Sequence, residues 1–220
     1  MWIEAETADE LFSKVVSSLT PTNSAGSNVT AEIINANICL KDPTRNTMCE
    51  CIRKMPIRYA VGELLWYNSR NNTAQSISTF SKFWKNISND DGTVNSNYGH
   101  CIHDKFGFDQ WDMVVDLLKK DKSTRQAILH IKEARDILNN PTKDLNCTIS
   151  LQFLIRNNKL DMITTMRSND IWLGLPYDVF NFTCMQIQMA MTLGVEIGVY
   201  YHNVGSLHLY TKDVEKLKGG

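Results

Sequence analysis

The sequence predicts an α+β fold, a single domain over residues 1–220 in which helices pack on a mixed β-sheet. Three observations lead to this prediction. The chain has 220 residues, of which 43% are hydrophobic and 21% are charged, and this size and composition suit one buried core. Helical spacing of apolar residues prevails up to residue 121, and strand-like patterns prevail after it. Strands and helices do not alternate regularly, so a parallel βαβ fold is not expected.

Helices are predicted first. Apolar residues recur at helical spacing in four segments, 7–19, 59–69, 76–87 and 108–121. Residues 29–40 alternate like a strand, and the polar residues of 21–28 and 89–99 predict loops.

Strands are predicted to dominate the second half, at 125–131, 147–158, 159–168 and 195–210. The sequence RNNK at 156–159 is typical of a hairpin turn between two of them. Residues 176–194 form an apolar segment that predicts a helix, with Gly194 as its C-terminal stop.

Charge and cysteine usage exclude several classes of function. The net charge is -1, which offers no general basic field for strong nucleic-acid binding. The six cysteines show no zinc-site spacing, so no metal site and free thiols are expected. No apolar run approaches the roughly 18 residues of a membrane span. We therefore expect a cytoplasmic protein, in the host cytoplasm if the chain is viral.

Cys147 is the first candidate for chemistry. A thiol attacks only as a thiolate, which nearby positive charge favours. If the hairpin at RNNK is regular, Arg167 lies close to Cys147 and lowers its pKa, and Arg167 with Ser168 can hold a phosphate. Spacing alone favours the alternative of a buried structural cysteine and a surface arginine.

Glu63 lies on an apolar helix face, where a carboxylate is costly unless it is paired or functional. Burial would raise its pKa toward neutrality, as acid–base chemistry requires. The alternative is a glutamate at the solvent boundary. Asp178, within the apolar LGLPYDVF, poses a similar question. It is either a helix cap or a specificity determinant.

Five further residues are weaker candidates, and most have a structural alternative. His208 and Tyr210 share one face of a predicted strand and can donate to a sugar hydroxyl, or form a structural pair. Trp84 and Tyr98 flank the polar loop like walls around a flat heterocycle, although Trp84 also suits a core helix. Arg125 stands at a turn-to-strand junction, where it can meet an anion or simply be solvated.

The order of these motifs resembles the thymidylate synthase superfamily from about residue 28 to 213. MRSNDIWLGLPYDVF is similar to its most diagnostic block. VNSNYG and NVGSLHLY resemble the phage deoxycytidylate hydroxymethylases, and Ser206 stands where synthases usually have Asp. Asp178 stands where synthases usually have the asparagine that recognises uracil. Phage DNA modification or nucleoside biosynthesis is the setting that this resemblance implies.

Chemistry agrees with the choice of cytosine. Cytosine presents an N3 acceptor beside an N4 amino donor, which a neutral carboxylic acid matches. Once a thiolate has added to C6, N3 requires a proton. Asp178 can supply it and then accept from both N–H groups, so the interaction strengthens as the intermediate forms.

The resemblance implies a one-carbon transferase in which Cys147 adds to C6 of CMP or dCMP. Carbon C5 would take the one-carbon unit of the co-substrate 5,10-methylenetetrahydrofolate, and water would complete a hydroxymethyl group. The roles implied for single residues are proton transfer by Glu63 and Tyr98, phosphate binding by Arg167, Ser168 and Arg125, sugar binding by His208 and Tyr210, and folate binding by Trp84, Asp170 and Gly174. Arg125 would come from the other subunit of a sheet-to-sheet homodimer.

Three departures from the family pattern leave alternatives open. Arg125-Gln126 stands where two arginines are usual, the loop 23–28 lacks a basic residue, and the C-terminal segment that closes over folate is expected to be short or absent. The alternatives are a synthase or hydroxymethylase that uses dUMP, a dCMP C5-methylase, and a weakly active homologue that binds nucleotide or RNA. The choice between ribose and deoxyribose also stays open.

Overall fold

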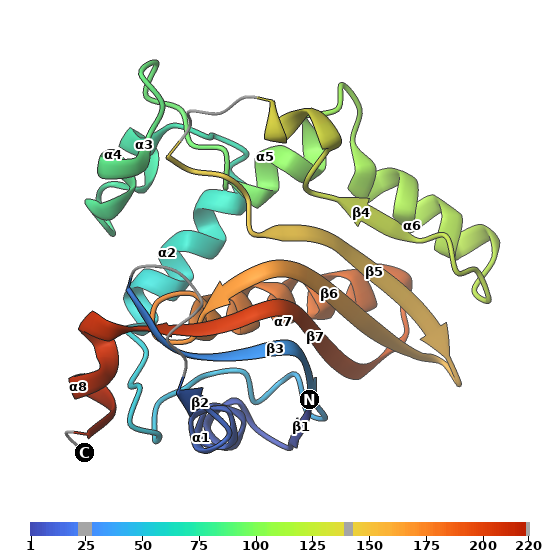
Figure 1. The fold of residues 1–220 in the computed structure, drawn as a ribbon. Coiled ribbons are helices and arrows are strands. Elements are labelled where there is room, and N and C mark those ends of the chain that lie inside the picture. The colour runs from blue at the N-terminus through green and yellow to red at the C-terminus, as the bar shows by residue number, and fades with distance from the viewer. Residues whose placement is uncertain (22–27, 139–142, 219–220) are drawn as a thin grey trace.

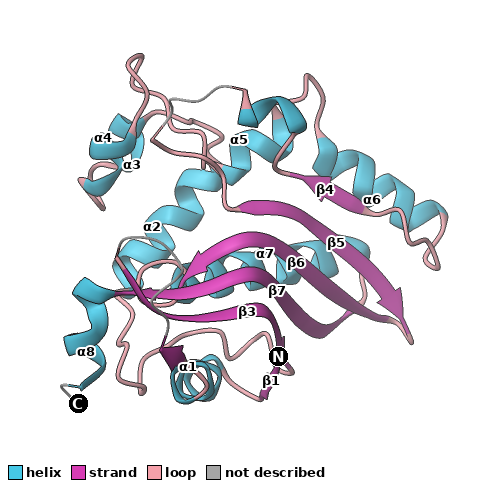
Figure 2. Cartoon of the chain, viewed as in Figure 1, coloured by secondary structure: helices cyan, strands magenta, loops and turns pink. Residues whose placement is uncertain are grey.

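The computed structural model describes residues 1–21, 28–138 and 143–218. Its centre is a mixed sheet with the strand order β1-β3-β7-β6-β5-β4, and β2 pairs with β3 at its edge. The strands are β1 (Trp2–Ala5), β2 (Thr20–Pro21), β3 (Val29–Leu40), β4 (Ile128–His130), β5 (Thr148–Arg156), β6 (Lys159–Asp170) and β7 (Glu196–Tyr210). Strands β6 and β7 are parallel, whereas β5–β6 and β3–β7 are antiparallel. The predicted mixed α+β architecture is confirmed (Figure 2).

The helices are α1 (Ala8–Ser17), α2 (Ile57–Asn68), α3 (Ala74–Ile77), α4 (Phe83–Ile87), α5 (Tyr98–His103), α6 (Gln110–Lys120), α7 (Leu175–Leu193) and α8 (Val214–Lys218). Short 3-10 helices occupy Ala134–Ile137 and Thr211–Asp213. The long helix α7 lies behind strands β5 to β7 in Figure 1, and α2 crosses beside its beginning. The N-terminal helix α1 lies at the other end of the sheet, near β1 and β3.

Helix α7 provides most of the core that covers the sheet. Pro176 stands in its first turn, where the missing N–H costs nothing. Phe182, Met185 and Met189 are buried against the strands. The helix ends at Gly194, whose φ of 64° is the left-handed conformation that glycine adopts readily. The prediction of a helix at 176–194 is confirmed, and so is its stop.

The β5–β6 hairpin sets the register of the site. Asn157 and Asn158 have φ values of 51° and 59°, as the two-residue turn of a twisted hairpin requires. Pairing then runs from Arg156 opposite Lys159 to Thr148 opposite Met166, with one irregularity near the end. The turn therefore decides which residues of β6 lie beside the residue that precedes β5.

Three predicted elements differ from the observed ones. The helix predicted at 76–87 is wrong, because the segment forms α3 and α4 with a turn between them. Ser78 donates to the carbonyl of Gln75 and Ser81 accepts from the N–H of Phe83, so hydroxyls replace helical hydrogen bonds at the break. The strand predicted at 125–131 is confined to β4, and helix α5 begins before the predicted loop 89–99 ends. Most of the predicted loop at 21–28 lies outside the described residues.

Two further expectations concern the cysteines and membrane-spanning helices. All six cysteines are free thiols. Within the part of the chain that the structure describes, no helix has the length and apolar character needed to cross a membrane.

Candidate active site

The candidate site lies where the end of β6 meets the residue before β5 and the first turns of α7. The N–H of Arg167 donates to the carbonyl of Cys147 at 2.9 Å. The hydroxyl of Ser168 lies 3.6 Å from the thiol of Cys147, within hydrogen-bond range of sulfur. The amide of Asn169 donates to Asp178 Oδ2 at 2.7 Å. Three consecutive residues of β6 thus connect the cysteine to the aspartate.

The guanidinium of Arg167 lies next to Cys147, as the hairpin predicted. It donates to the carbonyls of Asn146 at 3.1 Å and Leu145 at 2.7 Å, and to Ser168 Oγ at 3.0 Å. The thiol of Cys147 is half-buried, and burial raises its pKa although Arg167 and Ser168 act to lower it. The predicted effect of Arg167 is present but is outweighed, so the resting group is a thiol.

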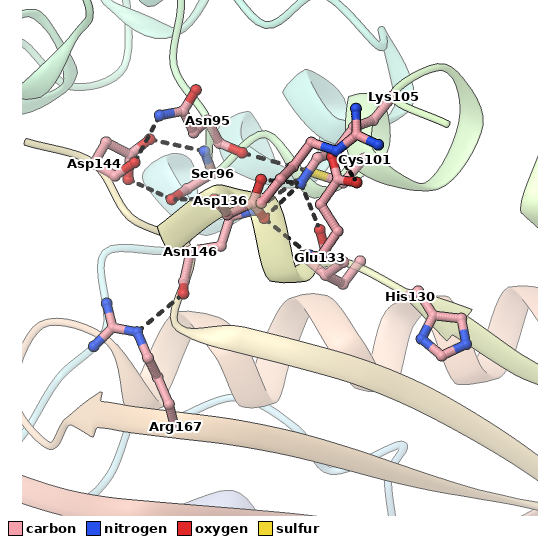
Figure 3. A network of polar contacts seen from close by, with 12 residues as sticks. Asn95, Ser96, Cys101, Lys105, His130, Glu133, Asp136, Asp144, Asn146 and Arg167 are labelled. Atoms are coloured by element: carbon pink, nitrogen blue, oxygen red, sulfur yellow. Dashed lines mark hydrogen bonds and ion pairs between the residues drawn. The ribbon is translucent and has the colours of Figure 1, made fainter. Parts of the chain in front are cut away.

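The segment that carries Cys147 is held from two sides (Figure 3). On one side the carboxylate of Asp144 accepts from the backbone N–H of Ser96 at 2.8 Å and from the Ser96 hydroxyl. The amide of Asn95 donates to the carbonyl of Asp144 at 2.8 Å. On the other side lies the guanidinium of Arg167. This bracing positions the cysteine without help from a helix.

Glu63 is buried inside helix α2, so the solvent-boundary alternative is wrong. The hydroxyl of Tyr59 donates to Oε1 at 2.8 Å, and the amide of Asn181 donates to Oε2 at 2.7 Å. The pKa of Glu63 is raised to about 8, because burial, with a smaller contribution from the nearby Asp178, outweighs the opposing effect of the two donors. A carboxyl that exchanges its proton near neutral pH suits acid–base chemistry.

Trp84 is buried near the carboxyl of Glu63 and does not lie on the protein surface. Only 8% of the residue is exposed, and the centroid of its ring lies 5.0 Å from that of Trp66. Its indole N–H donates to the hydroxyl of Tyr59 at 3.0 Å. A chain of donors therefore runs from Trp84 through Tyr59 to Glu63. Contact of Trp84 with folate stays a prediction.

Asp178 does not cap a helix, so that alternative is wrong. The N-cap of α7 is Gly174, and no side chain caps that end. The carboxyl of Asp178 is half-buried and accepts from Asn169 instead. Burial raises the pKa of Asp178 to about 7, against the lowering effect of Asn169. The group is ready to change its protonation state near neutral pH.

The turn before α7 keeps Asn169 and Asp178 together. Asp170 accepts from the N–H groups of Trp172 at 2.7 Å and Leu173 at 3.0 Å. A Cβ at Gly174 would lie 2.6 Å from Asn169 Nδ2 and 3.3 Å from Asp178 Oδ2. Glycine is therefore needed so that the amide reaches the carboxyl. Asp170 and Gly174 act here on the protein itself, and their folate contacts stay predictions.

Tyr98 is buried near the same centre. Its ring stacks on Phe182 with centroids 5.5 Å apart. Burial raises its pKa well above the ordinary value, and the nearby Asp178 and Cys147 contribute to that shift. Its hydroxyl therefore lies within the electrostatic reach of both groups, as a role in proton transfer requires.

His208 and Tyr210 pack together as the strand pattern predicted, with ring centroids 4.9 Å apart. His208 pairs across the sheet with Asp170, which brings it to the end of β6. Arg125 lies elsewhere. It is exposed in the bend before β4, and its carbonyl accepts from Gln152, about 16 Å along β5 from Cys147. The chain's own Arg125 is not brought to this site.

Sequence analysis missed Asn169, Asn181 and Tyr59. Two signals were available in the spacing. Tyr59 stands four residues before Glu63, and Asn181 stands three after Asp178, so each pair shares one helix face. Asn169 lies inside the RSND motif but carries no signal of its own.

The two carboxyl groups make stability depend on pH. Glu63 and Asp178 have ordinary pKa values of 4.5 and 3.8, and both are raised in the folded protein. The folded state thus keeps protons that the unfolded chain releases, so the free energy of unfolding falls as the pH rises from about 4 to 8. We predict that Glu63→Gln reduces this fall between pH 5 and 8 by on the order of 3 kcal/mol, measured by urea unfolding.

The exposed Glu50 offers a matched control, because Glu50→Gln removes the same charge without changing a buried group. In that variant the free energy of unfolding should fall with pH as steeply as in the wild type. If it falls equally steeply in Glu63→Gln and in the wild type, Glu63 has an ordinary pKa in the folded protein.

Comparisons with known proteins identify the family to which the chain belongs. The sequence model of the thymidylate synthase family matches residues 22–219. The deoxyuridylate hydroxymethyltransferase of Bacillus phage SP01 is 31% identical over 208 residues, 86% of this chain and 54% of that protein. The thymidylate synthase of Bacillus atrophaeus is 28% identical over 174 residues, 76% of each chain. The chain thus spans about half the length of the phage relative.

The fold has a known counterpart as well. The thermostable thymidylate synthase A from Bacillus subtilis superposes with a TM-score of 0.77 at 23% identity, over 96% of this chain and 82% of that one. Because the family model covers nearly the whole sequence, the chain belongs to the thymidylate synthase family.

Proposed function

We propose that this protein transfers a one-carbon unit to C5 of a cytidylate, CMP or dCMP, and that water completes the product as a hydroxymethyl group. The observation that carries the proposal is the half-buried carboxyl of Asp178, which accepts from Asn169 and lies close enough to Cys147 to influence the pKa of the thiol. Asp178 stands in the chain at the point where a base reader is expected. A neutral acid there matches the N3 and N4 edge of cytosine.

A second candidate is the same transfer to a uridylate. It is favoured by the SP01 relative, whose name describes a deoxyuridylate hydroxymethyltransferase. In that case an ionised Asp178 would accept from N3–H of uracil but would face the O4 atom with a second acceptor. The chemistry of Asp178 therefore favours cytosine, and the relative favours uracil.

The residues around Cys147 support covalent addition to C6. The thiol rests protonated because burial raises its pKa, so its proton must leave as the nucleophile attacks. Arg167 stabilises the thiolate that results, and Ser168 can donate to it. Asp178 gives its proton to N3 as charge accumulates there. The growing charge on Asp178 is then stabilised by the amide of Asn169.

Glu63 is suited to move a proton at the one-carbon centre. Its two donors hold the carboxyl in one orientation, and its pKa of about 8 allows it to give and to regain a proton. We propose that it orders the water that completes the hydroxymethyl group. Tyr98 lies near enough to Cys147 and Asp178 to take part in the proton path.

The surroundings of Trp84 and Gly174 fit a flat folate ring. Phe83 packs on Trp84 with ring centroids 5.8 Å apart and is 52% exposed, and Leu173, beside Gly174, is 40% exposed. These exposed apolar side chains and the carboxylate of Asp170 are of the types that suit an aromatic heterocycle with N–H donors. When bound, 5,10-methylenetetrahydrofolate supplies the one-carbon unit. Trp84, Asp170 and Gly174 would help to hold it.

The nucleotide would be held at its other end by Arg167 and Ser168 through the 5′-phosphate, and by His208 and Tyr210 through the sugar. Arg167 Nη1 and Ser168 Oγ lie 3.0 Å apart, so both can reach one phosphate. Displacing the carbonyl contacts of the guanidinium would free further donors for it.

We propose a homodimer that pairs two sheets through the face opposite α7. Buried residues of β6 and β7 alternate with less buried ones such as Ile163 and Val199, and Leu154 of β5 shares their face. Apolar residues on an open sheet face require a partner. Such a pairing would supply Arg125 to the site of the partner subunit.

A product assay tests the main proposal. We predict that incubation with 5,10-methylenetetrahydrofolate and either CMP or dCMP adds the mass of CH₂O to the nucleotide. Cys147→Ser should reduce turnover at least 1,000-fold while the thermal unfolding temperature stays within a few degrees. Turnover of dUMP alone would reject the cytidylate proposal, and a gain of CH₂ would indicate methylation.

Asp178→Asn tests how the base is chosen. An asparagine amide can accept from N3–H and donate to O4 of uracil, so kcat/KM for dUMP relative to dCMP should rise at least 100-fold. The matched control is Asp112→Asn, an exposed aspartate on α6. An unchanged ratio in Asp178→Asn would mean that Asp178 does not read the base.

Mixing of subunits tests the role of Arg125. Arg125→Ala and Cys147→Ser homodimers should each be inactive, because each lacks one component of every site. Each mixed dimer should have one intact site of two, so a random 1:1 mixture, in which half of the dimers are mixed, should recover up to about one quarter of the wild-type activity. Failure to recover activity in mixed dimers verified by mass would place Arg125 outside the partner's site.

A further inference from the structure

A buried hydrogen-bond chain continues inward from Asp178 and Asn169. Asn169 Oδ1 lies 3.0 Å from His202 Nε2, and His202 Nδ1 lies 2.8 Å from the Tyr200 hydroxyl. That hydroxyl lies 3.1 Å from Thr164 Oγ1. Thr164, Tyr200 and His202 are fully buried and Asn169 is 3% exposed. The chain runs between β6 and β7, in which Thr164 and His202 are paired.

Charge determines the direction of the hydrogen bond between Asn169 and His202. Burial lowers the pKa of His202 to about 3, so the ring is neutral and carries one N–H. Asn169 Oδ1 can only accept, so the N–H must lie on Nε2. Nδ1 is then an acceptor, and it takes the single hydrogen of the Tyr200 hydroxyl when Thr164 Oγ1 in turn donates to the tyrosine oxygen. The side-chain oxygen of Asn169 thus sets the tautomer of His202, and the Tyr200 hydroxyl stabilises it by donating to Nδ1.

The orientation of the Asn169 amide in turn determines where Asp178 holds its proton. The amide N–H points at Oδ2 of Asp178, so this oxygen must accept. A proton on Asp178 therefore resides on Oδ1, which has no hydrogen-bond partner among the described residues. The same amide orientation serves the ionised carboxylate, so Asn169 does not need to turn during a reaction cycle.

We propose that His202 and Tyr200 are specificity-determining positioning residues, which select cytosine by keeping the acid proton of Asp178 on Oδ1. Cytosine then finds a donor for N3 on Oδ1 and an acceptor for its amino group on Oδ2. Uracil would need the opposite arrangement, with a proton on Oδ2, where it would meet the N–H of Asn169. This inference rests on the proposed function, because it explains how that base is chosen.

The experiment compares His202→Phe, His202→Gln and Tyr200→Phe with the wild type. For each, kcat/KM is measured with dCMP and dUMP, and Kd for both nucleotides is measured without folate. His202→Phe removes the N–H that donates to Asn169 Oδ1, so the ratio of kcat/KM for dCMP to that for dUMP should fall at least ten-fold. His202→Gln keeps an N–H and should retain the preference within about three-fold. Tyr200→Phe should reduce the preference with KM for dCMP rising more than kcat falls.

Tyr201→Phe is the matched control, since it removes a hydroxyl from the next residue of β7 on the opposite face. It should leave the preference unchanged. Nitrogen-15 NMR of the wild-type protein should show a neutral His202 with its proton on Nε2. Tyr200→Phe should populate the other tautomer.

The possible outcomes distinguish a failure of this inference from a failure of the proposed function. Wild-type turnover of dUMP alone rejects the proposed base before any variant is examined. A dCMP-specific wild type whose preference survives His202→Phe and Tyr200→Phe rejects the role of the chain. Should His202→Phe not fold, a proton on Nδ1 in the wild-type NMR spectrum rejects it as well.

Discussion

Desolvation of two carboxyl groups, Glu63 and Asp178, is the constraint on which the site depends. Helix α7 packs on the sheet and against α2, and it thereby shields Glu63 almost fully and Asp178 in part from water. An unpaired ionised carboxylate would be costly there, so their pKa values move toward neutrality. The amides of Asn181 and Asn169 moderate this cost, one for each carboxyl. Proton transfer at neutral pH follows from packing.

The β5–β6 hairpin is the second requirement, because it joins this acidic centre to the nucleophile. Its two left-handed asparagines set a register in which Arg167 lies beside Cys147. The next residues of β6 carry the contacts to Cys147 and Asp178 in turn. A slip of one residue would turn each of these side chains to the other face of the sheet. The positions of the proposed nucleophile, phosphate-binding residues and base-recognising residue therefore depend on a single turn.

Sequence reasoning recovered the elements whose signals are local. The Asn157-Asn158 turn, the helix ending at Gly194 and the burial of Glu63 were all predictable from neighbouring residues. It failed at 76–87, where apolar spacing outweighed serine hydroxyls that compete for the backbone. The bracing of Asp144 by Ser96 was also missed, since 48 residues separate them and no periodicity connects them.

The sequence by itself determined the family, the choice of Cys147 as the proposed nucleophile and the presence of a carboxyl at position 178, because residue types in a given order carry that information. Only the tertiary structure decided that Asp178 is no helix cap and that Trp84 points inward to Tyr59. It alone connected Asn169 to His202, 33 residues away. The physical reason is that hydrogen-bond direction and desolvation depend on which groups meet in the core, and adjacent strands bring together residues that are far apart in sequence.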